Sequence, residues 1–266
     1  MVECVTGAAG QNAAGGKPAP EVVPASAGAR AGPHGPERTP RVGRGTSQWR
    51  DWGMDALPRV NGQPVRVQHL RIDAAIELQL LLPADDEAWL ESAVRGERDP
   101  YAGLVWPASI AAARALLPEL RPGLRVLDAG SGTGVVALAA ACAGASVTAM
   151  DYDPVALALV EASAARMNLP LRTLRFDLRS HEPLPPADFV VFADVLYQRD
   201  LSFVVAGRAV EAHRRGTRVL VADPGRMGRE AFSTAVRAHG HTPVFAPVDV
   251  EVPGEPRVEH VGIAWL

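Results

Sequence analysis

The stretch "VLDAGSGTGVV", residues 126–136, decides how the chain is expected to fold. An apolar run ends on Asp128, glycines follow at alternate positions, and an Ala-rich helical pattern begins at Val135. Glycine permits positive φ and lets a ligand approach the backbone, while a helix N-terminus offers unpaired N–H donors. The stretch therefore predicts a strand, a ligand-binding loop and a helix.

The same alternation continues to residue 240 and then stops. Apolar strand-like runs are expected at 124–130, 146–153, 171–177, 187–194 and 217–225, with helical patterns between them. Such alternation predicts an α/β, doubly wound and mostly parallel sheet with helices on both faces. The last two strand-like runs, 241–252 and 258–266, have only a short link between them, which requires an antiparallel C-terminal hairpin.

The residues before the glycine stretch divide into two parts. Of the first 50 residues, 24 are Ala, Gly or Pro with no apolar period, so residues 1–55 are expected to be a disordered tail. Residues 56–120 are expected to form N-terminal cap segments, with a hairpin at 60–67 and a helix beginning at Pro107. Residues 121–266 are expected to form the ligand-binding core.

Composition excludes several classes of function. The net charge of −3 combines +3 in the first 50 residues with −6 in the rest, which argues against duplex nucleic acid as a partner. Two cysteines, Cys4 and Cys142, fit a reducing, cytoplasmic compartment. No apolar run is long enough to span a bilayer. Lys17 is the only lysine, so a folded lysine for a Schiff base or a P-loop is excluded. The scattered histidines predict no metal site.

The spacing of the glycines indicates which ligand the loop binds. The dinucleotide fingerprint G-x-G-x-x-G would place glycine at 135, where the chain has valine. Asp128 beside the loop suits a ligand with a cationic amino group and suits a pyrophosphate poorly. Asp151, at the end of the next strand and 21 residues after Gly130, can accept hydrogen bonds from ribose hydroxyls. A nucleoside with an amino acid and no phosphate describes S-adenosylmethionine, and a tight structural turn is the alternative.

With these features the sequence resembles the class I S-adenosylmethionine-dependent methyltransferases from about Tyr101 onward. The resemblance implies a seven-stranded sheet with the last strand inserted antiparallel. It also implies that Asp128 lies near the methionine amino group, and that Asp151 binds the ribose. The other cofactor-binding residues that it implies are Trp106, Gly130, Ser131, Gly132, Gly134, Tyr152, Asp177, Leu178 and Ala193. Three simpler roles remain open: Asp153 as a helix N-cap, Asp177 as a loop cap and Trp106 as a core residue.

The end of the strand at 189–194 is expected to face the transferred methyl group. Here the chain has Asp194 and Tyr197, and an Asp-x-x-Tyr pattern resembles the family 16 protein-lysine methyltransferases. The stretches "DPYAGLVWP" (99–107) and "LVADPGR" (220–226) resemble the electron transfer flavoprotein beta-subunit lysine methyltransferases and their bacterial relatives, some of which are predicted nicotinamide N-methylases. Asp194 and Tyr197 are thus the candidate catalytic residues, with a capping Asp and a packing Tyr as the alternative.

The resemblance implies an N-methyltransferase that acts on a lysine of a protein substrate, such as an electron transfer flavoprotein subunit. Three alternatives stay open: a small-molecule, nicotinamide-like N-methyltransferase, a nicotinamide-dependent oxidoreductase, and a non-catalytic cofactor-binding scaffold. No membrane partner is expected, and a monomer is slightly favoured.

Overall fold

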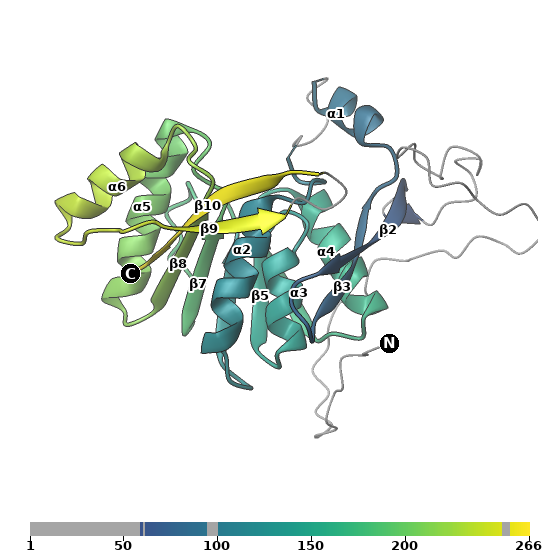
Figure 1. Cartoon of the computed structure of the whole chain (residues 1–266), viewed down its shortest axis with the longest axis horizontal. Helices are drawn as coiled ribbons and strands as arrows, with labels where there is room; N and C mark the ends of the chain where they lie inside the picture. Colours follow the sequence, from purple (N-terminus) through teal and green to yellow (C-terminus); the bar gives the residue numbers. More distant parts are fainter. Residues whose placement is uncertain (1–58, 61, 95–100, 252–255) are drawn as a thin grey trace, which may run out of the picture.

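A seven-stranded sheet forms the centre of the computed structural model, which describes residues 59–60, 62–94, 101–251 and 256–266 (Figure 1). In their order across the sheet, its strands are β6 (Leu171–Arg175), β5 (Ser146–Asp151), β4 (Arg125–Ala129), β7 (Phe189–Ala193), β8 (Arg218–Asp223), β10 (Val258–Trp265) and β9 (Ala246–Glu251). Neighbouring strands are parallel from β6 to β8, and β10 pairs antiparallel with both β8 and β9. This arrangement confirms the expected parallel sheet and the C-terminal hairpin.

Helices cover both faces of this sheet because its strands are apolar on both sides. On one face Val126, Val147 and Leu220 pack against α2 (Pro107–Leu116) and α3 (Val135–Cys142). On the other face Leu127, Phe192 and Val221 pack in the same core as α5 (Arg199–Arg214) and α6 (Arg229–Ala238), which lie side by side in Figure 1. Successive residues of one strand thus enter opposite cores, as expected for a strand buried on both faces.

A second, three-stranded antiparallel sheet precedes the main one. It consists of β1 (Arg59–Val60), β2 (Gln63–Arg71) and β3 (Glu77–Pro83), in that order. The pairing of Val60 with Gln63 confirms the hairpin expected at 60–67. The pairing of β2 with β3 over seven residue pairs was not expected from the sequence.

This small sheet rests on α4 (Pro154–Arg166), as Figure 1 shows for β3. Ser163 accepts a hydrogen bond from the Leu81 amide (2.9 Å) and donates one to the Leu159 carbonyl (2.7 Å). The same joint buries Val65 and Leu81 against apolar residues of α4. Helix α1 (Asp86–Val94) follows β3 and contributes the buried Trp89 to this core.

The topology places the reactive edge of the molecule. The chain leaves β4 for β5 and β6 in one direction, and it returns to the other side of β4 with β7 and β8. Ligands bind at such a switch point, outside the carboxyl ends of the strands. The proposed limits of the tail, the cap segments and the core remain predictions. The expected tail, residues 1–55, lies outside the described residues.

Candidate active site

A cavity lies at the switch point, at the carboxyl ends of β4, β5, β6 and β7. It encloses about 670 Å³ of space, with its open mouth included. Its lining contains ten of the thirteen residues predicted from the sequence, namely Trp106, Gly130, Gly132, Asp151, Tyr152, Asp177, Leu178, Ala193, Asp194 and Tyr197. The structure therefore gathers most of the candidate residues around one space.

The glycine loop forms one wall of this cavity. The amides of Gly130 and Ser131 donate to the Met150 carbonyl (2.8 and 2.9 Å), which ties the loop to the end of β5. Gly132 has a φ of +51°, and a Cβ placed on it would meet no atom within 4 Å. The backbone at Gly132 is therefore bare and faces open space, as a closely approaching ligand requires.

Asp151 stands opposite this loop with both carboxylate oxygens in use. One oxygen accepts the Gly132 amide (2.9 Å) and the other accepts the Asp153 amide (3.0 Å). Each carboxylate oxygen has further lone pairs, so Asp151 can still accept hydrogen bonds from a ligand in the cavity. Asp153 accepts the Val155 amide (2.8 Å) and is the N-cap of α4, the simpler of the roles left open for it.

Three predicted residues in or next to the glycine loop do not line the cavity. Gly134 begins α3 with a φ of +77°. Ser131 is buried, and its hydroxyl is without a hydrogen-bond partner in the described part of the chain. Asp128 accepts the Ala137 amide (3.0 Å). Burial raises the pKa of Asp128 to about 7, the Ala137 amide opposes this rise, and the charge of Asp151 adds to it. Asp128 is thus an acid that a nearby cation would ionise.

The loop after β6 forms the other side of the cavity. It contributes Phe176, Asp177, Leu178 and Arg179, and the half-exposed Tyr152 lies beside them. Asp177 accepts the Arg179 amide (2.8 Å), so it does cap this loop, and it lines the cavity as well. Asp177 is therefore a loop cap that also lines the cavity, and its contact with a cofactor stays a prediction.

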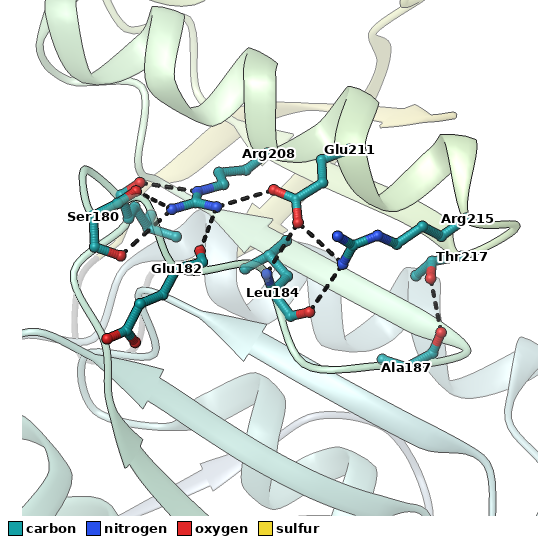
Figure 2. A network of polar contacts seen from close by, with 9 residues as sticks. Ser180, Glu182, Leu184, Ala187, Arg208, Glu211, Arg215 and Thr217 are labelled. Carbon is teal, nitrogen blue, oxygen red and sulfur yellow. Dashed lines mark hydrogen bonds and ion pairs between the residues drawn. The ribbon is translucent and has the colours of Figure 1, made fainter.

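A buried arginine from α5 holds this loop in place (Figure 2). Arg208 donates to the carbonyls of Leu178 (3.0 Å) and Glu182 (2.7 Å), and it also bonds the Ser180 carbonyl. Glu211, one turn along α5, pairs with the same guanidinium at 2.9 Å. Arg208 thus supplies the donors that the loop carbonyls need, and it sets the position of the cavity wall without touching the cavity.

The acceptor side centres on Asp194, directly after β7. Asp194 is buried and has a φ of +57°, a left-handed conformation that Asp tolerates better than most residues. Arg226 binds it bidentately, with Nε on Oδ1 at 2.7 Å and Nη2 on Oδ2 at 3.0 Å. The Arg226 guanidinium also lies 5.2 Å from the ring centre of Trp106. This pair was not predicted, although "DPGR" was noticed as a motif.

The Asp-Pro-Gly-Arg turn after β8 explains how Arg226 reaches Asp194. Asp223 is fully buried, and its Oδ2 accepts the amides of Gly225 (2.8 Å) and Arg226 (3.1 Å). The Arg229 side chain binds the same oxygen at 2.6 Å. Burial raises the pKa of Asp223, and these hydrogen bonds oppose the rise. The buried carboxylate therefore folds the turn back so that Arg226 points across to the end of β7.

Three aromatic rings enclose a slot in front of Asp194. Tyr101 lies 5.8 Å from Trp106 and 5.3 Å from Tyr197 between ring centres. These rings line a small cavity with Asp194 and Arg226, and four of its five lining residues also line the larger cavity. Trp106 therefore faces the site and is not a core residue. The slot joins the glycine-loop cavity to the carboxylate, which is the arrangement expected of a donor site and an acceptor site.

The position of this aromatic slot depends on Gly103, since a Cβ there would lie 2.7 Å from Pro83 and 2.8 Å from the Trp89 ring. The loop of residues 101–107 is thus pressed against β3 and α1, which fixes the two rings that it contributes. No group of three or more His, Cys, Asp or Glu side chains in the described ranges could hold a metal ion.

Comparison with known proteins gives the site its context. Residues 126–222 match the family model described as "Methyltransferase domain". This segment is therefore similar to methyltransferase domains. It spans β4 to β8 and includes the glycine loop, Asp151, the loop after β6 and Asp194. The resemblance stated from the sequence motifs is confirmed.

Two groups of curated relatives align with this chain over more residues than the domain model does. The electron transfer flavoprotein beta subunit lysine methyltransferase of Xenopus laevis is 35% identical over 162 residues, which cover 57% of this chain and 63% of that protein. The ribosomal protein L11 methyltransferase of Thermus thermophilus is 38% identical over 128 residues, which cover 47% and 49%. The chain thus spans less than two thirds of the length of the curated relatives that it matches.

Among solved structures, magnesium protoporphyrin IX methyltransferase from Synechocystis PCC 6803, with bound SAM, is similar with a TM-score of 0.47. It is 19% identical, and the similarity covers 59% of this chain and 77% of that one. None of the described helices is both long and apolar enough to cross a membrane.

Proposed function

We propose that this chain is an S-adenosylmethionine-dependent N-methyltransferase that acts on a lysine side chain of a protein. The observation that carries the proposal is the Asp194–Arg226 pair, set in an aromatic slot that opens onto the glycine-loop cavity. The match to the methyltransferase domain and to lysine methyltransferases supports it.

The residues around the cavity fit the proposed cofactor. Gly132 leaves the space that a ligand needs, and Asp151 offers acceptors for ribose hydroxyls. Tyr152, Phe176 and Asp177 would hold the adenine, while Asp128 behind the loop would favour the cationic amino group. Ser131 offers a buried hydroxyl that lacks a partner in the described part of the chain. When bound, S-adenosylmethionine supplies an electrophilic methyl group on a sulfonium.

The acceptor slot has to bind a lysine amine in its neutral form, because the protonated form has no lone pair. A free lysine has a pKa of about 10.4, so the site must disfavour the ammonium. Apolar ring faces do so by desolvation. The charge of Arg226 offsets that of Asp194, so the pair does not stabilise an ammonium as a lone carboxylate would.

Asp194 then serves as a hydrogen-bond acceptor that orients the neutral amine. Its position is fixed by two hydrogen bonds from Arg226, and free lone pairs remain on both oxygens. Tyr197 and Trp106 line the slot, where their rings would displace water from around a bound amine. Alignment of two reactants in a dry site is a large source of rate enhancement in enzymes. Arg226 acts through Asp194 and is a positioning residue.

The acceptor protein is proposed from the relatives. Electron transfer flavoprotein beta subunit and ribosomal protein L11 are the substrates that their names state. We favour the former, because that match covers more of this chain. The proposal also includes a cytoplasmic location, because two cysteines fit a reducing compartment. A monomeric state completes it.

A labelling experiment tests the function. The full chain is incubated with S-adenosylmethionine that carries an isotope-labelled methyl group and with a cell lysate, and parallel reactions contain purified flavoprotein beta subunit or L11. We expect label in the protein fraction, at a lysine located by mass spectrometry. Label in low-mass products alone would favour a nicotinamide-like acceptor instead. Cofactor binding without any transfer would favour a scaffold, and tight binding of a nicotinamide dinucleotide without S-adenosylmethionine binding would favour an oxidoreductase.

A further inference from the structure

A second and larger hollow adjoins the aromatic slot, and the proposed chemistry does not use it. It measures about 1330 Å³ with its open mouth included, about twice the cofactor-side cavity on the same measure. Its walls come from five segments: β2, β3, the loop of residues 103–107, the turn after β8, and residues 257–259 at the start of β10. We refer to it below as the basic cleft.

The charge of the basic cleft is opposite to that of the folded chain. Arg66, Arg226 and Arg257 line it, and Glu259 is its one acidic side chain. Residues 51–266 as a whole carry a net charge of −6, whereas in the cleft three arginines face two carboxylates, Glu259 and the Asp194 that Arg226 binds, which leaves a local excess of one positive charge. Arg257 pairs with Glu259 at 2.9 Å, and Arg66 donates to the side chain of Gln68 at 2.8 Å. A guanidinium carries five N–H donors and can therefore contact more than one partner at a time.

The basic cleft is continuous with the acceptor slot. Trp106 and Arg226 line both, and Arg226 is the residue that holds Asp194. A polypeptide whose lysine enters the slot must therefore lay neighbouring residues near the cleft. An extended chain advances about 3.3 Å per residue, so residues within a few positions of the lysine reach it.

We propose that the basic cleft binds acidic side chains of the acceptor protein that lie next to the target lysine. The inference rests on the proposed function, and it adds a sequence preference that the relatives' names do not state. Arginine forks bind carboxylates bidentately, which gives such a contact direction as well as charge. The acidic residues fix the register of the acceptor chain, and the slot then receives one lysine and not its neighbours.

Binding measurements with short peptides test the proposal independently of methyl transfer. One fluorescent peptide has Asp or Glu on both sides of a central lysine, and a matched peptide has Asn or Gln at those positions. We expect fluorescence anisotropy with the full chain to show roughly tenfold tighter binding of the acidic peptide, a difference that shrinks as salt is raised. Arg66→Ala and Arg257→Ala should each reduce the acidic-to-neutral ratio by roughly threefold or more.

Arg172→Ala is the matched control, because Arg172 is exposed on β6, at the opposite edge of the sheet from β9. It removes the same charge and should leave the ratio unchanged. Equal affinity for both peptides would overturn the proposal, and so would an equal loss in Arg172→Ala. Tighter binding of a short single-stranded oligonucleotide than of the acidic peptide would assign the cleft to nucleic acid instead. If the peptides bind as expected but no methyl group is transferred, the proposed function fails and the cleft stands.

Discussion

Asp194 has a left-handed backbone conformation, with a φ of +57°, at the position where the strand ends and the acceptor slot begins. Few side chains tolerate this conformation, and Asn and Asp are the usual exceptions apart from glycine. Asp194→Asn is therefore a better probe of the carboxylate than Asp194→Ala, because it changes the charge without adding backbone strain.

The first prediction concerns the ion pair. Asp194→Asn and Arg226→Lys should each lower kcat by about tenfold or more, since both remove the bidentate contact that fixes the acceptor. Because the two residues act as a unit, the double variant should lose little more than either single variant. Steady-state methyl-transfer rates measure this effect, and calorimetry should show unchanged affinity for S-adenosylmethionine. Losses that multiply in the double variant would show that the two residues act separately.

The second prediction concerns the pH dependence of cofactor binding. Burial raises the pKa of Asp128 to about 7, so its carboxyl loses its charge as the pH falls through that value. We expect the affinity of the wild-type chain for S-adenosylmethionine to weaken between about pH 8 and about pH 6. Asp128→Asn should bind weakly throughout, with a flatter pH profile. An identical profile in both proteins would remove Asp128 from the binding site.

The same shift has an opposite effect on the stability of the ligand-free chain. The folded-state pKa of Asp128 lies above its ordinary value of 3.8, so its stabilising contribution is complete at low pH and is lost as the pH rises through about 7. The stability of Asp128→Asn minus that of wild type should therefore be larger at about pH 8 than at about pH 5. Each pKa unit corresponds to about 1.4 kcal/mol, so the gain is a few kcal/mol at most. Denaturant melts at the two pH values measure it.

At the scale of elements, the loop after β6 depends on α5, the helix that follows the next strand, β7. Arg208 of α5 bonds three carbonyls of that loop and pairs with Glu211 (Figure 2). The third prediction is that Arg208→Met costs about 3 kcal/mol of stability, because it leaves Glu211 and the loop carbonyls without their partner. Affinity for S-adenosylmethionine should fall as well, since the loop carries Asp177 and Leu178.

Arg215→Met is the matched control for that prediction. Arg215 is the C-cap residue of α5 and pairs with the same Glu211 at 3.1 Å; it also donates to the Leu184 carbonyl (3.1 Å), but its side chain is about half exposed. An exposed pair contributes about 1 kcal/mol or less, so this variant should be nearly as stable as wild type and should bind the cofactor normally. Equal losses in the two variants would mean that the loop needs only charge on α5 and not the buried contact.

The elements show how far the sequence could be interpreted. Alternating apolar strands and helices from Leu124 onward predict the main sheet correctly, because each strand is short, apolar and bounded by turn residues. The three-stranded sheet was missed in part, since the run at 77–83 alternates polar and apolar residues only over its first four positions and then continues as two more leucines and a proline. Site residues at strand ends could be predicted, because the carboxyl ends of parallel strands mark the site.

Arg208 and Arg226 were not assigned to the site, because nothing in the local sequence separates them from the other arginines. Their roles depend on contacts with residues about 30 positions away in the chain.

At the scale of the whole molecule, the small sheet and the main body are joined by apolar packing and by hydrogen bonds, one of which goes to a buried hydroxyl. Ser163 accepts the Leu81 amide, so the fourth prediction is that Ser163→Ala leaves that amide unsatisfied and costs roughly 1–3 kcal/mol. Hydrogen exchange should accelerate in β3 more than in β4. Thr234→Ala removes a hydroxyl from an exposed site on α6 and should change neither quantity. Uniform acceleration in both strands would show that the two sheets unfold together.

The order of strands at the far edge of the main sheet constrains how the chain can assemble. β9 precedes β10 in the sequence, yet β10 lies between β9 and β8. On a ribosome, β9 emerges before β10, the strand that separates it from β8. β9 therefore has no strand to pair with in the native order until β10 has been made. The Asp-Pro-Gly-Arg turn leaves β8 at this same edge. Synthesis would therefore complete the donor half of the site before the acceptor half is secured.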